Sequence, residues 1–233
     1  MKKKLLYVTS RIPWPLDKGD KLRAYYQIRD LSKSYDIYLF CVNDTGVVSG
    51  AEAELKKYCK EINIASLSRL RIFFNLAFAF FGKDPFQVSY FHNQSLQKKF
   101  DDFADRIKPD RIFCQLIRTA PFVRNRKEKK ILDYMDVFSK GIERRIAGVN
   151  FFKRPIFRME FKRLLRYENE VFSWFDSKII ITKQDRDFIP HPSNKEIQVI
   201  ANGVDIEFFK PVSTAKKFDL LFNGNMNYPP NVE

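Results

Sequence analysis

Seven short apolar runs, separated by segments of helical or turn character, are the feature that most narrows the folds open to this chain. Most of the runs are apolar at successive positions, which is typical of strands buried on both faces of a parallel sheet. Helical patterns fall between them, as they do in α/β folds. The sequence therefore predicts a doubly wound, mostly parallel sheet of about seven strands. The expected strands are residues 4–9, 36–42, 61–65, 111–117, 129–135, 177–182 and 196–201.

The most distinct helix is expected at residues 155–175. Pro155 suits a first helical turn, and apolar side chains then recur at helical spacing. These apolar side chains are Phe157, Phe161, Leu164, Leu165, Phe172 and Phe175. Glu168 falls on the same stripe, where its carboxylate either neutralises a neighbouring Arg or Lys or points into a site.

The composition sets outer limits on class and function. A chain of 233 residues can form one large domain or one and a half ordinary ones. A hydrophobic share of 45% supports a folded core and excludes a disordered chain. The net charge of +14 attracts phosphates, nucleic acid or an anionic bilayer without distinguishing among them.

Cysteine usage and the N-terminus bear on the compartment. Cys41, Cys59 and Cys114 are scattered and lack a Cys-x-x-Cys spacing, which is typical of reduced structural thiols and argues against a metal site. The N-terminal apolar segment is too short for a secretory signal. No run approaches the roughly 20 apolar residues of a membrane-spanning helix. We therefore expect a cytoplasmic protein.

A stiff, charged segment, PWPLDKGDKLR, joins the first strand to the first helix. Pro13 and Pro15 hold the backbone extended, and Gly19 permits either a turn of positive φ or the close approach of a ligand. Asp20 is expected to be the N-cap of the helix. In an open parallel sheet, ligands bind beyond the carboxyl ends of the strands, which is where this segment lies.

The same segment has the features of an anion site. Free amides at the start of a helix, beside a glycine, attract negative charge. Lys18, Lys21 and Arg23 add positive charge. The alternative is an ordinary helix entry, because a single glycine is a weaker signal than a Gly-x-Gly fingerprint.

Polar residues also follow the fourth and fifth expected strands. Arg118 comes after the fourth strand, and Asp136, Ser139 and Lys140 come after the fifth. Asp133 and Asp136 could hold a metal as a pair, but no third ligand lies nearby in the sequence. A capping role for Asp136 or Ser139 is the alternative.

Neither histidine is assigned a chemical role. His92 precedes a helix expected to start at Asn93 or Ser95, and it is interpreted as a surface or capping residue, with a general base as the alternative. His191 lies in a proline-flanked loop. The sequence shows no Ser-His-Asp or Cys-His arrangement.

The segment RLRIFFNLAFAFFGK, residues 69–83, is strongly aromatic. Its apolar residues spread around most of a helical wheel, and Arg69, Arg71 and Lys83 flank them. One interpretation is a buried helix that covers the sheet or meets another domain. The other is an interfacial helix that dips into an anionic leaflet, which the basic flanks and the net charge favour. The second interpretation predicts peripheral contact with the inner face of a membrane.

Five stretches occur in a fixed order: RIPWPLDKGDKLRAYYQIRDLSK, LDYMDVFSK, YENEVFSWFDSKIIITKQD, ANGVDIEFFKP and FNGNMNYPPNVE. Together they resemble the retaining glycosyltransferases of the GT-B fold, family 4, in the branch associated with exopolysaccharide synthesis. The strongest pieces are the Pro-x-Pro-x-x-Lys-Gly-Asp elbow and the Asn-Gly-Val-Asp motif followed by Phe-x-Pro. The resemblance runs through nearly the full length of the chain.

The resemblance implies a bacterial hexosyltransferase with two Rossmann-like domains, one for the acceptor and one for a nucleotide-diphosphate sugar. Residues 1–211 would form the acceptor domain, and residues 212–233 would form a linker and the first strand and turn of a truncated donor domain. The acceptor would be a saccharide or a polyprenyl-linked molecule in cell-surface polysaccharide or glycolipid synthesis. Such a fold needs no metal, because basic side chains and helix starts neutralise the departing diphosphate. This chain alone would then be inactive.

The resemblance also assigns roles to residues near the first and fifth strands. Gly19 and Asp20 match the glycine loop beside the transferred sugar and its phosphates, and Asp136 matches an acidic residue after the fifth strand and is the expected catalytic residue. Met135 stands where many relatives have a histidine near the reaction centre, which puts that role in doubt here. The expected acceptor and phosphate cleft consists of Lys18, Gly19, Asp20, Arg23, Arg118, Ser139 and Lys140.

Further matches lie toward the C-terminus. Asn202 and Gly203 match the turn that closes the acceptor domain, and Gly224 matches the glycine turn that opens the donor domain. Glu168 matches a glutamate of the family's long helix, which favours a structural part near the cleft.

Two other functions stay open at this point. Met135 and the missing donor half suggest a non-catalytic module that binds sugars or other anions. A nucleic-acid-binding module is the weaker alternative, because the aromatic residues follow core periodicity instead of interleaving with basic residues on one face.

Overall fold

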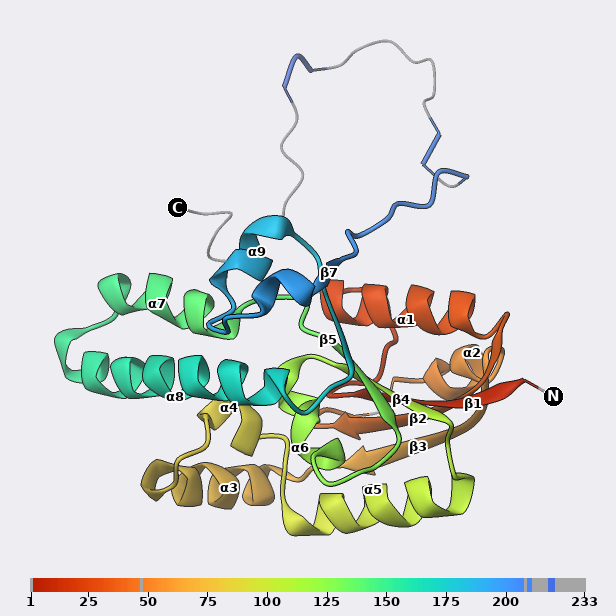
Figure 1. The fold of residues 1–233 in the computed structure, drawn as a ribbon, viewed down its shortest axis with the longest axis horizontal. Coiled ribbons are helices and arrows are strands. Elements are labelled where there is room, and N and C mark those ends of the chain that lie inside the picture. Colours follow the sequence, from red (N-terminus) through yellow and green to blue (C-terminus); the bar gives the residue numbers. More distant parts are fainter. Residues whose placement is uncertain (1, 47, 208, 211–217, 221–233) are drawn as a thin grey trace. The chain divides into compact units, whose positions relative to one another are not determined.

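The computed structural model describes residues 2–46, 48–207, 209–210 and 218–220 (Figure 1). The chain divides into two compact units, Met1–Asn202 and Gly203–Glu233. All the helices and strands described below belong to the first unit. Of the donor-domain start expected at residues 212–233, only residues 218–220 are described, so Gly224 lies outside the described residues.

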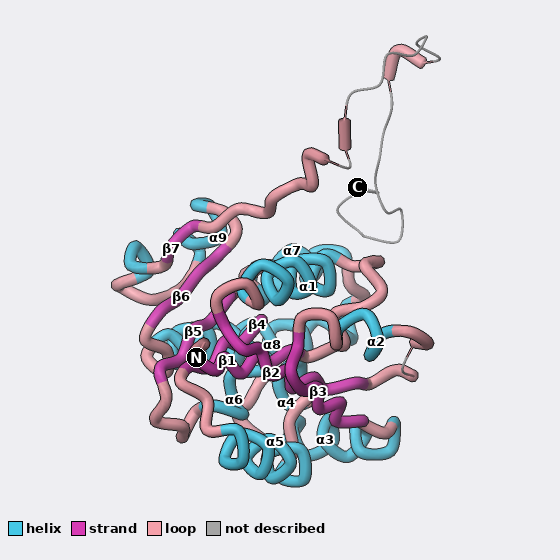
Figure 2. The backbone as a smooth tube through the Cα atoms, turned by 90° about the vertical axis from the view of Figure 1, so that its right-hand side faces the viewer, coloured by secondary structure: helices cyan, strands magenta, loops and turns pink. Residues whose placement is uncertain are grey.

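A seven-stranded sheet runs through the first unit, with every neighbouring pair parallel and the order β3-β2-β1-β4-β5-β6-β7 (Figure 2). The predicted α/β fold is therefore confirmed. The strand order reverses between β1 and β4, because the chain runs outward from β1 to β3 and then crosses back to β4. The strands are β1 (Lys3–Thr9), β2 (Tyr35–Asn43), β3 (Cys59–Ser66), β4 (Arg111–Gln115), β5 (Lys129–Asp133), β6 (Ser177–Ile180) and β7 (Gln198–Val199).

Helices cover both faces of the sheet, with α1 and α2 on one face and α5, α6 and α8 on the other (Figures 1 and 2). Leu5 and Tyr7 of β1 pack with the first group, and Leu6 and Val8 pack with the second. This burial on both faces explains the unbroken apolar runs of the sequence. The helices are α1 (Gly19–Leu31), α2 (Ala51–Leu55), α3 (Arg69–Phe81), α4 (Phe86–Ser89), α5 (Gln94–Ile107), α6 (Ala120–Val123), α7 (Phe138–Gly148), α8 (Arg154–Phe172) and α9 (Lys183–Phe188).

Two local predictions about helix starts are confirmed. The helix expected at residues 155–175 is α8, and Pro155 occupies its first turn. Asn93 is the N-cap of α5, and its side chain accepts a hydrogen bond from the Leu96 N–H at 3.0 Å. Both signals act within one helical turn, so they can be read without knowledge of the fold.

The fourth and fifth strands end earlier than the sequence predicts. β4 stops at Gln115 and β5 stops at Asp133, because Leu116 and Met135 adopt left-handed backbone conformations with φ of 67° and 58°. Such conformations are costly for residues with a Cβ atom, and they concentrate at functional sites. Both turns lie at the carboxyl edge of the sheet.

Candidate functional site

The candidate site lies at the carboxyl edge of the sheet, where the strand order reverses between β1 and β4. In open α/β sheets the loops diverge at such a point and leave a crevice for a ligand. The chain after β1 leads to Gly19 and Asp20 at the start of α1, and the chain after β4 carries Arg118. Gln115, at the end of β4, donates its Nε2–H to the Asp20 carbonyl at 2.8 Å, which ties the two segments together.

Gly19 is exposed at the start of α1, and a Cβ atom added there would meet no heavy atom within 4 Å. Its backbone does not have a positive φ, so the prediction of a left-handed turn is wrong. The other prediction, an open approach for a ligand, agrees with the empty space above it. Gly19 also lies at the same edge as Arg118 and Asp136, since the segments that carry all three follow strands of one parallel sheet.

Asp20 does not cap α1, contrary to the prediction. Lys18 is the N-cap residue, without a capping bond from its side chain, and Asp20 lies in the first turn. The Asp20 carboxylate instead pairs with Arg11 at 3.1 Å. Lys18 and Lys21 line a small cavity of about 80 Å³ beside it, and Lys21 also pairs with Asp17 at 2.9 Å. The basic character expected around the start of α1 is therefore present.

Arg23 is turned into the protein and does not add charge to the open cleft. Its Nε pairs with the fully buried Asp133 at 2.6 Å, and its other nitrogens donate to Asn202 Oδ1 at 2.8 Å and to the Ile200 carbonyl at 3.1 Å. Asp133 also accepts a hydrogen bond from Gln27 at 2.9 Å. These bonds join α1, β5 and the end of the first unit, so Arg23 and Asn202 support the site and do not line it.

The Arg118 guanidinium forms no ion pair with any described residue, although the carboxylates of Asp20, Asp44 and Asp136 act on it from farther away. Its Nε is buried, and within the described part of the chain the side chain has no hydrogen-bond or ion-pair partner. The guanidinium lies 5.0 Å from the ring centre of Phe91 and 5.1 Å from that of Phe138. Burial, aided by the charge of Arg11, lowers the pKa of Arg118 to about 10, so it stays charged at neutral pH. An anionic ligand would compensate this buried charge.

Asp136 is exposed beyond β5. Partial desolvation raises the pKa of its carboxyl, as do the carboxylates of Asp185, Asp20 and Asp133, whereas the charge of Arg118 opposes the rise. These mutual effects place Asp136 in the electrostatic field of both Arg118 and Asp20. A carboxylate with a raised pKa can accept a proton from a bound hydroxyl group.

Ser139 is fully buried and does not face the cleft. Its hydroxyl donates to Glu168 Oε2 at 2.6 Å and its N–H donates to Oε1 at 3.1 Å. Glu168 thereby caps the start of α7, so it neither neutralises an Arg or Lys nor points into a site. Burial raises the pKa of Glu168 to about 7, although the hydrogen bonds from Ser139 and the Phe138 N–H oppose the rise. The role of Glu168 is structural, in agreement with the resemblance.

The remaining predicted residues add little to the cleft. Lys140 pairs with Glu143 at 2.6 Å and lies 5.0 Å from the Phe188 ring centre, so its charge is already compensated. Gly203 belongs to the second unit, and Gly224 lies outside the described residues. Neither glycine is placed relative to the cleft.

Three residues that the sequence analysis missed line the cleft beside Arg118. Arg11, Asp44 and Tyr90 contribute to a cavity of about 280 Å³ that also contains Arg118. The Tyr90 hydroxyl donates to Asp44 Oδ2 at 3.0 Å. Arg11 closely follows the end of β1, so its position in the sequence could have predicted a place at this edge of the sheet. Tyr90 follows α4 and reaches this edge only through tertiary packing.

The structure gives no support for a metal centre in the part of the chain that it describes, where no three His, Cys, Asp or Glu side chains are grouped suitably. His92 pairs through Nε2 with Gln97 at 2.8 Å, and its ring packs against Phe122. Burial lowers the pKa of His92. It shares a different cavity with Gln97 and Phe122, which none of the cleft residues lines.

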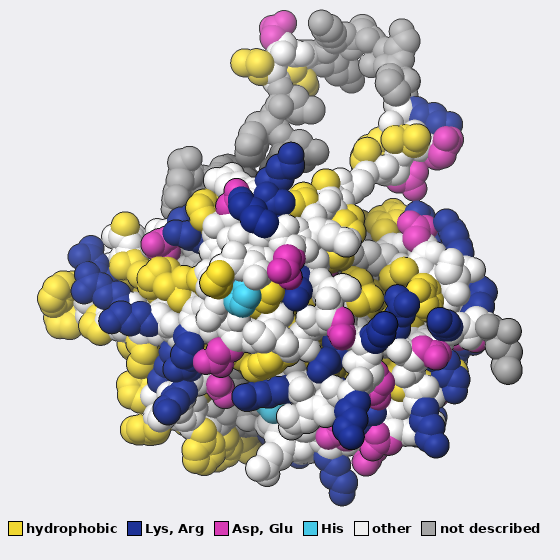
Figure 3. Space-filling model, viewed as in Figure 1, with side chains coloured by type: hydrophobic (Ala, Val, Ile, Leu, Met, Phe, Trp, Pro, Cys, Tyr) yellow, Lys and Arg dark blue, Asp and Glu magenta, His cyan; other side chains and the backbone are white. Residues whose placement is uncertain are grey.

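Helix α3 is exposed, so the interpretation of residues 69–83 as a buried, sheet-covering helix is wrong. Ala79 is its only buried residue, whereas Phe78 and Phe81 are 73% and 89% exposed. A second aromatic pair that the sequence analysis missed, Phe151 and Phe152, lies between α7 and α8 and is 75% and 84% exposed. Figure 3 shows hydrophobic surface over both places, with Lys and Arg side chains nearby. None of the described helices is long and apolar enough to cross a bilayer.

No protein-family model matches the chain, and no curated protein matches its sequence. Among solved structures, the chain is similar to the sucrose-phosphate synthase of Thermosynechococcus elongatus, with 13% identity and a TM-score of 0.55 over 90% of this chain and 51% of that one. A UDP-glucosyltransferase from Polygonum tinctorium matches with 8% identity and a TM-score of 0.49, over 88% of this chain and 53% of that one. A Medicago truncatula structure complexed with UDP-glucose matches with 13% identity and a TM-score of 0.49, over 93% of this chain and 55% of that one.

The similarity to sucrose-phosphate synthase shows the fold. The chain spans about half the length of the solved structures it matches. Its single parallel sheet corresponds to one Rossmann-like half of a GT-B fold. The part of the expectation that concerned the GT-B fold is therefore confirmed.

Proposed function

We propose that this chain is the acceptor-binding half of a retaining, family 4 glycosyltransferase that acts in cell-surface polysaccharide or glycolipid synthesis. The observation that carries the proposal is the cleft at the strand-order reversal, where the unpaired Arg118 faces the same edge as the open backbone at Gly19 and the carboxylate of Asp136. A transferred sugar with its diphosphate requires a cation, an open backbone approach and a proton acceptor within one crevice. This edge of the sheet supplies all three.

Arg118, Gly19 and Asp136 have different roles in the proposed reaction. Arg118 and the start of α1 neutralise charge on the departing diphosphate, which requires no metal ion. Gly19 leaves room for the sugar phosphate beside the backbone. The acceptor hydroxyl attacks the anomeric carbon from the face that the diphosphate leaves, so the glycosidic bond forms as the bond to the diphosphate breaks and the configuration is retained. Asp136 accepts the proton of that hydroxyl. The nucleotide itself is bound mainly by a second, donor-binding domain.

The proposed transferase activity is tested with the full-length protein that contains this chain. Transfer from a panel of UDP- and GDP-sugars to a membrane lipid extract is measured, and Arg118→Gln and Asp136→Asn are each expected to lower kcat/KM by about 100-fold. Glu143→Gln is the matched control, because Glu143 is exposed and, among the described residues, its ion pair is with Lys140. Undiminished transfer by both cleft variants would refute the proposed roles, and binding without any turnover would favour a non-catalytic sugar-binding module.

A separate experiment tests whether the nucleotide sugar is bound mainly by a second domain. Residues 1–233 alone are expected to bind UDP- and GDP-sugars more weakly than micromolar in calorimetry, because most donor contacts come from the second domain. Micromolar binding would contradict that division.

We further propose that the protein docks on the inner face of an anionic membrane. Phe74 and Phe78 project from the exposed face of α3, the exposed Arg69, Arg71 and Lys83 flank them, and Phe151 and Phe152 provide a second aromatic contact. Aromatic side chains insert at the level of the headgroups while basic residues attract anionic lipid.

Co-sedimentation with liposomes tests this docking. The wild type is expected to bind anionic vesicles more than neutral ones, and a Phe74→Ser, Phe78→Ser double variant is expected to lose most of the binding. Equal partitioning of the two proteins would count against membrane docking.

A further inference from the structure

A groove with a volume of about 620 Å³ lies over α6, between α5 and α8. Helix α6 has four residues, whereas α5 and α8 have 14 and 19, so a short helix flanked by two long ones covers this part of the sheet (Figure 1). Phe122 of α6, Gln97 of α5 and Tyr167 of α8 line the groove. The short connection between β4 and β5 therefore leaves room for a ligand.

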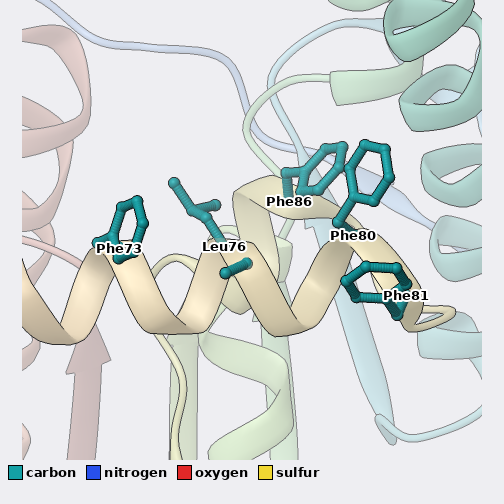
Figure 4. A pocket seen from close by; sticks show the side chains of 6 residues that line it. Phe73, Leu76, Phe80, Phe81 and Phe86 are labelled. Atoms are coloured by element: carbon teal, nitrogen blue, oxygen red, sulfur yellow. The ribbon is translucent and has the colours of Figure 1, made fainter.

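The α6 groove is separate from the cleft and from the apolar side of α3. Among the described residues, it shares no lining residue with the two cavities that contain Arg11. Figure 4 shows Phe73, Leu76 and Phe80 projecting from the same side of α3, and none of them lines the α6 groove. Asn75 of the same helix lines the groove instead. The groove is therefore a site of its own, with a polar wall on α3.

Three neutral polar groups around the groove are unpaired. Asn93 is the N-cap of α5, and because its Oδ1 accepts the Leu96 N–H at 3.0 Å, Nδ2 is identified as its donor group. This Nδ2 is buried and has no partner in the described part of the chain. The Ser89 hydroxyl and the Asn75 Oδ1 form no hydrogen bond with a described residue either. A ligand oxygen on Asn93 would relieve the cost of a buried, unpaired donor.

The charges around the groove balance, in contrast to those of the whole chain. Among the described lining residues, Asp84 and Asp101 are acidic and Arg124 and Arg126 are basic, whereas the chain carries a net charge of +14. Arg126 is also paired with Asp105 at 2.5 Å. An anion is therefore attracted more strongly to other parts of the protein, and the groove favours an uncharged ligand.

Aromatic side chains supply the apolar contacts of the groove. Trp174 and Tyr167 both line it, with their rings perpendicular and the ring centres 5.6 Å apart. Aromatic walls with a few neutral donors and acceptors suit a saccharide, because sugar hydroxyls both donate and accept hydrogen bonds and the C–H groups of a sugar ring pack on aromatic surfaces.

We propose that the α6 groove binds an uncharged oligosaccharide, with sugar hydroxyls on Asn93, Ser89 and Asn75 and a sugar ring against Trp174. The site is additional to the cleft, and the saccharide that it holds takes no part in the transfer reaction. The groups that bind it have no role in that reaction or in membrane docking, so the inference stands independently of the proposed function.

Calorimetry on the 233-residue chain tests the site with neutral trisaccharides of glucose, galactose, mannose and N-acetylglucosamine. Trigalacturonic acid is the charged comparison. At least one neutral trisaccharide is expected to bind about tenfold more tightly than trigalacturonic acid, because the groove has no excess positive charge to compensate for desolvated carboxylates. The opposite order would indicate adsorption to the basic surface, and a lack of binding by every neutral trisaccharide would also overturn the proposal.

Two variants locate the bound saccharide. Asn93→Ser keeps a capping oxygen but removes the amide donor, so it is expected to fold and to bind the trisaccharide about fivefold more weakly. Asn75→Ala should weaken binding similarly. Asn150→Ser is the matched control, because Asn150 also caps a helix start, by accepting the Phe152 N–H at 3.1 Å, and lies outside the groove. Unchanged affinity in both groove variants, or an equal loss in the control, would refute the site.

Asp136→Asn distinguishes the groove from the cleft. This variant is expected to bind the trisaccharide as the wild type does, because Asp136 does not line the groove. Affinity that is lost in Asp136→Asn and kept in Asn93→Ser would place the saccharide in the cleft, which would overturn the groove and support the proposed function. Groove binding together with an absence of sugar transfer by the full-length protein would refute the proposed function and leave the groove standing.

Discussion

Glu168 makes the stability of this protein depend on pH in a direction opposite to that of most paired carboxylates. The side chain is fully buried, and burial raises its pKa from 4.5 to about 7. The folded state therefore holds a proton that the unfolded chain releases above pH 4.5. The stabilisation is complete below that pH and is lost as the pH rises through about 7.

The magnitude follows from the two pKa values. At about 1.4 kcal/mol for each pKa unit, the full contribution is about 3 kcal/mol, most of which disappears between pH 5 and pH 8. Glu168→Gln removes the titrating group and keeps the size of the side chain. The free energy of unfolding of the wild type, relative to this variant, is expected to fall by about 2.5 kcal/mol over that interval.

Urea denaturation at pH 5, 6, 7 and 8 measures the effect, and comparison with the variant cancels the titration of His92 and Asp136. Glu170→Gln is the matched control, because Glu170 lies on the same helix but is exposed. Its pH profile is expected to parallel that of the wild type. Parallel profiles for the wild type and Glu168→Gln would show that Glu168 does not titrate in this range, and the reasoning from burial would be wrong.

Two further predictions concern the framework of the site. Arg23→Met leaves the buried Asp133 carboxylate unpaired and is expected to lower the free energy of unfolding by about 3–5 kcal/mol in urea, whereas Lys33→Met, which removes an exposed pair, should cost less than about 1 kcal/mol. Equal losses would contradict the burial of the first pair. Arg163→Met removes the bonds to the carbonyls at the end of α3, so amide hydrogen exchange in the α3–α4 turn should accelerate by about tenfold while the exposed control Arg158→Met leaves it unchanged. Unaltered exchange in Arg163→Met would mean that the turn is held by other contacts.

Sequence signals that act over a few residues were sufficient to predict much of the fold. The seven apolar runs, the cap at Asn93 and the proline at the start of α8 each act within a few residues, and the structure contains all of them. The ends of β4 and β5 were predicted too late, because the left-handed turns at Leu116 and Met135 fall on residues with no preference for that conformation. The carboxyl edge of the sheet was proposed as the ligand site from the sequence, because ligands of open parallel sheets bind where the strands end.

Only the tertiary structure decided which charged and aromatic residues are available to a ligand. Arg23 and Arg118 both follow strands in the sequence, yet Arg23 meets a carboxylate 110 residues away while Arg118 meets none among the described residues. The aromatic helix α3 could equally have been buried, and its exposure depends on which neighbours the fold supplies. Hydrophobic spacing specifies which segments form helices and strands, whereas charge pairing and burial arise between residues that the chain brings together only after folding.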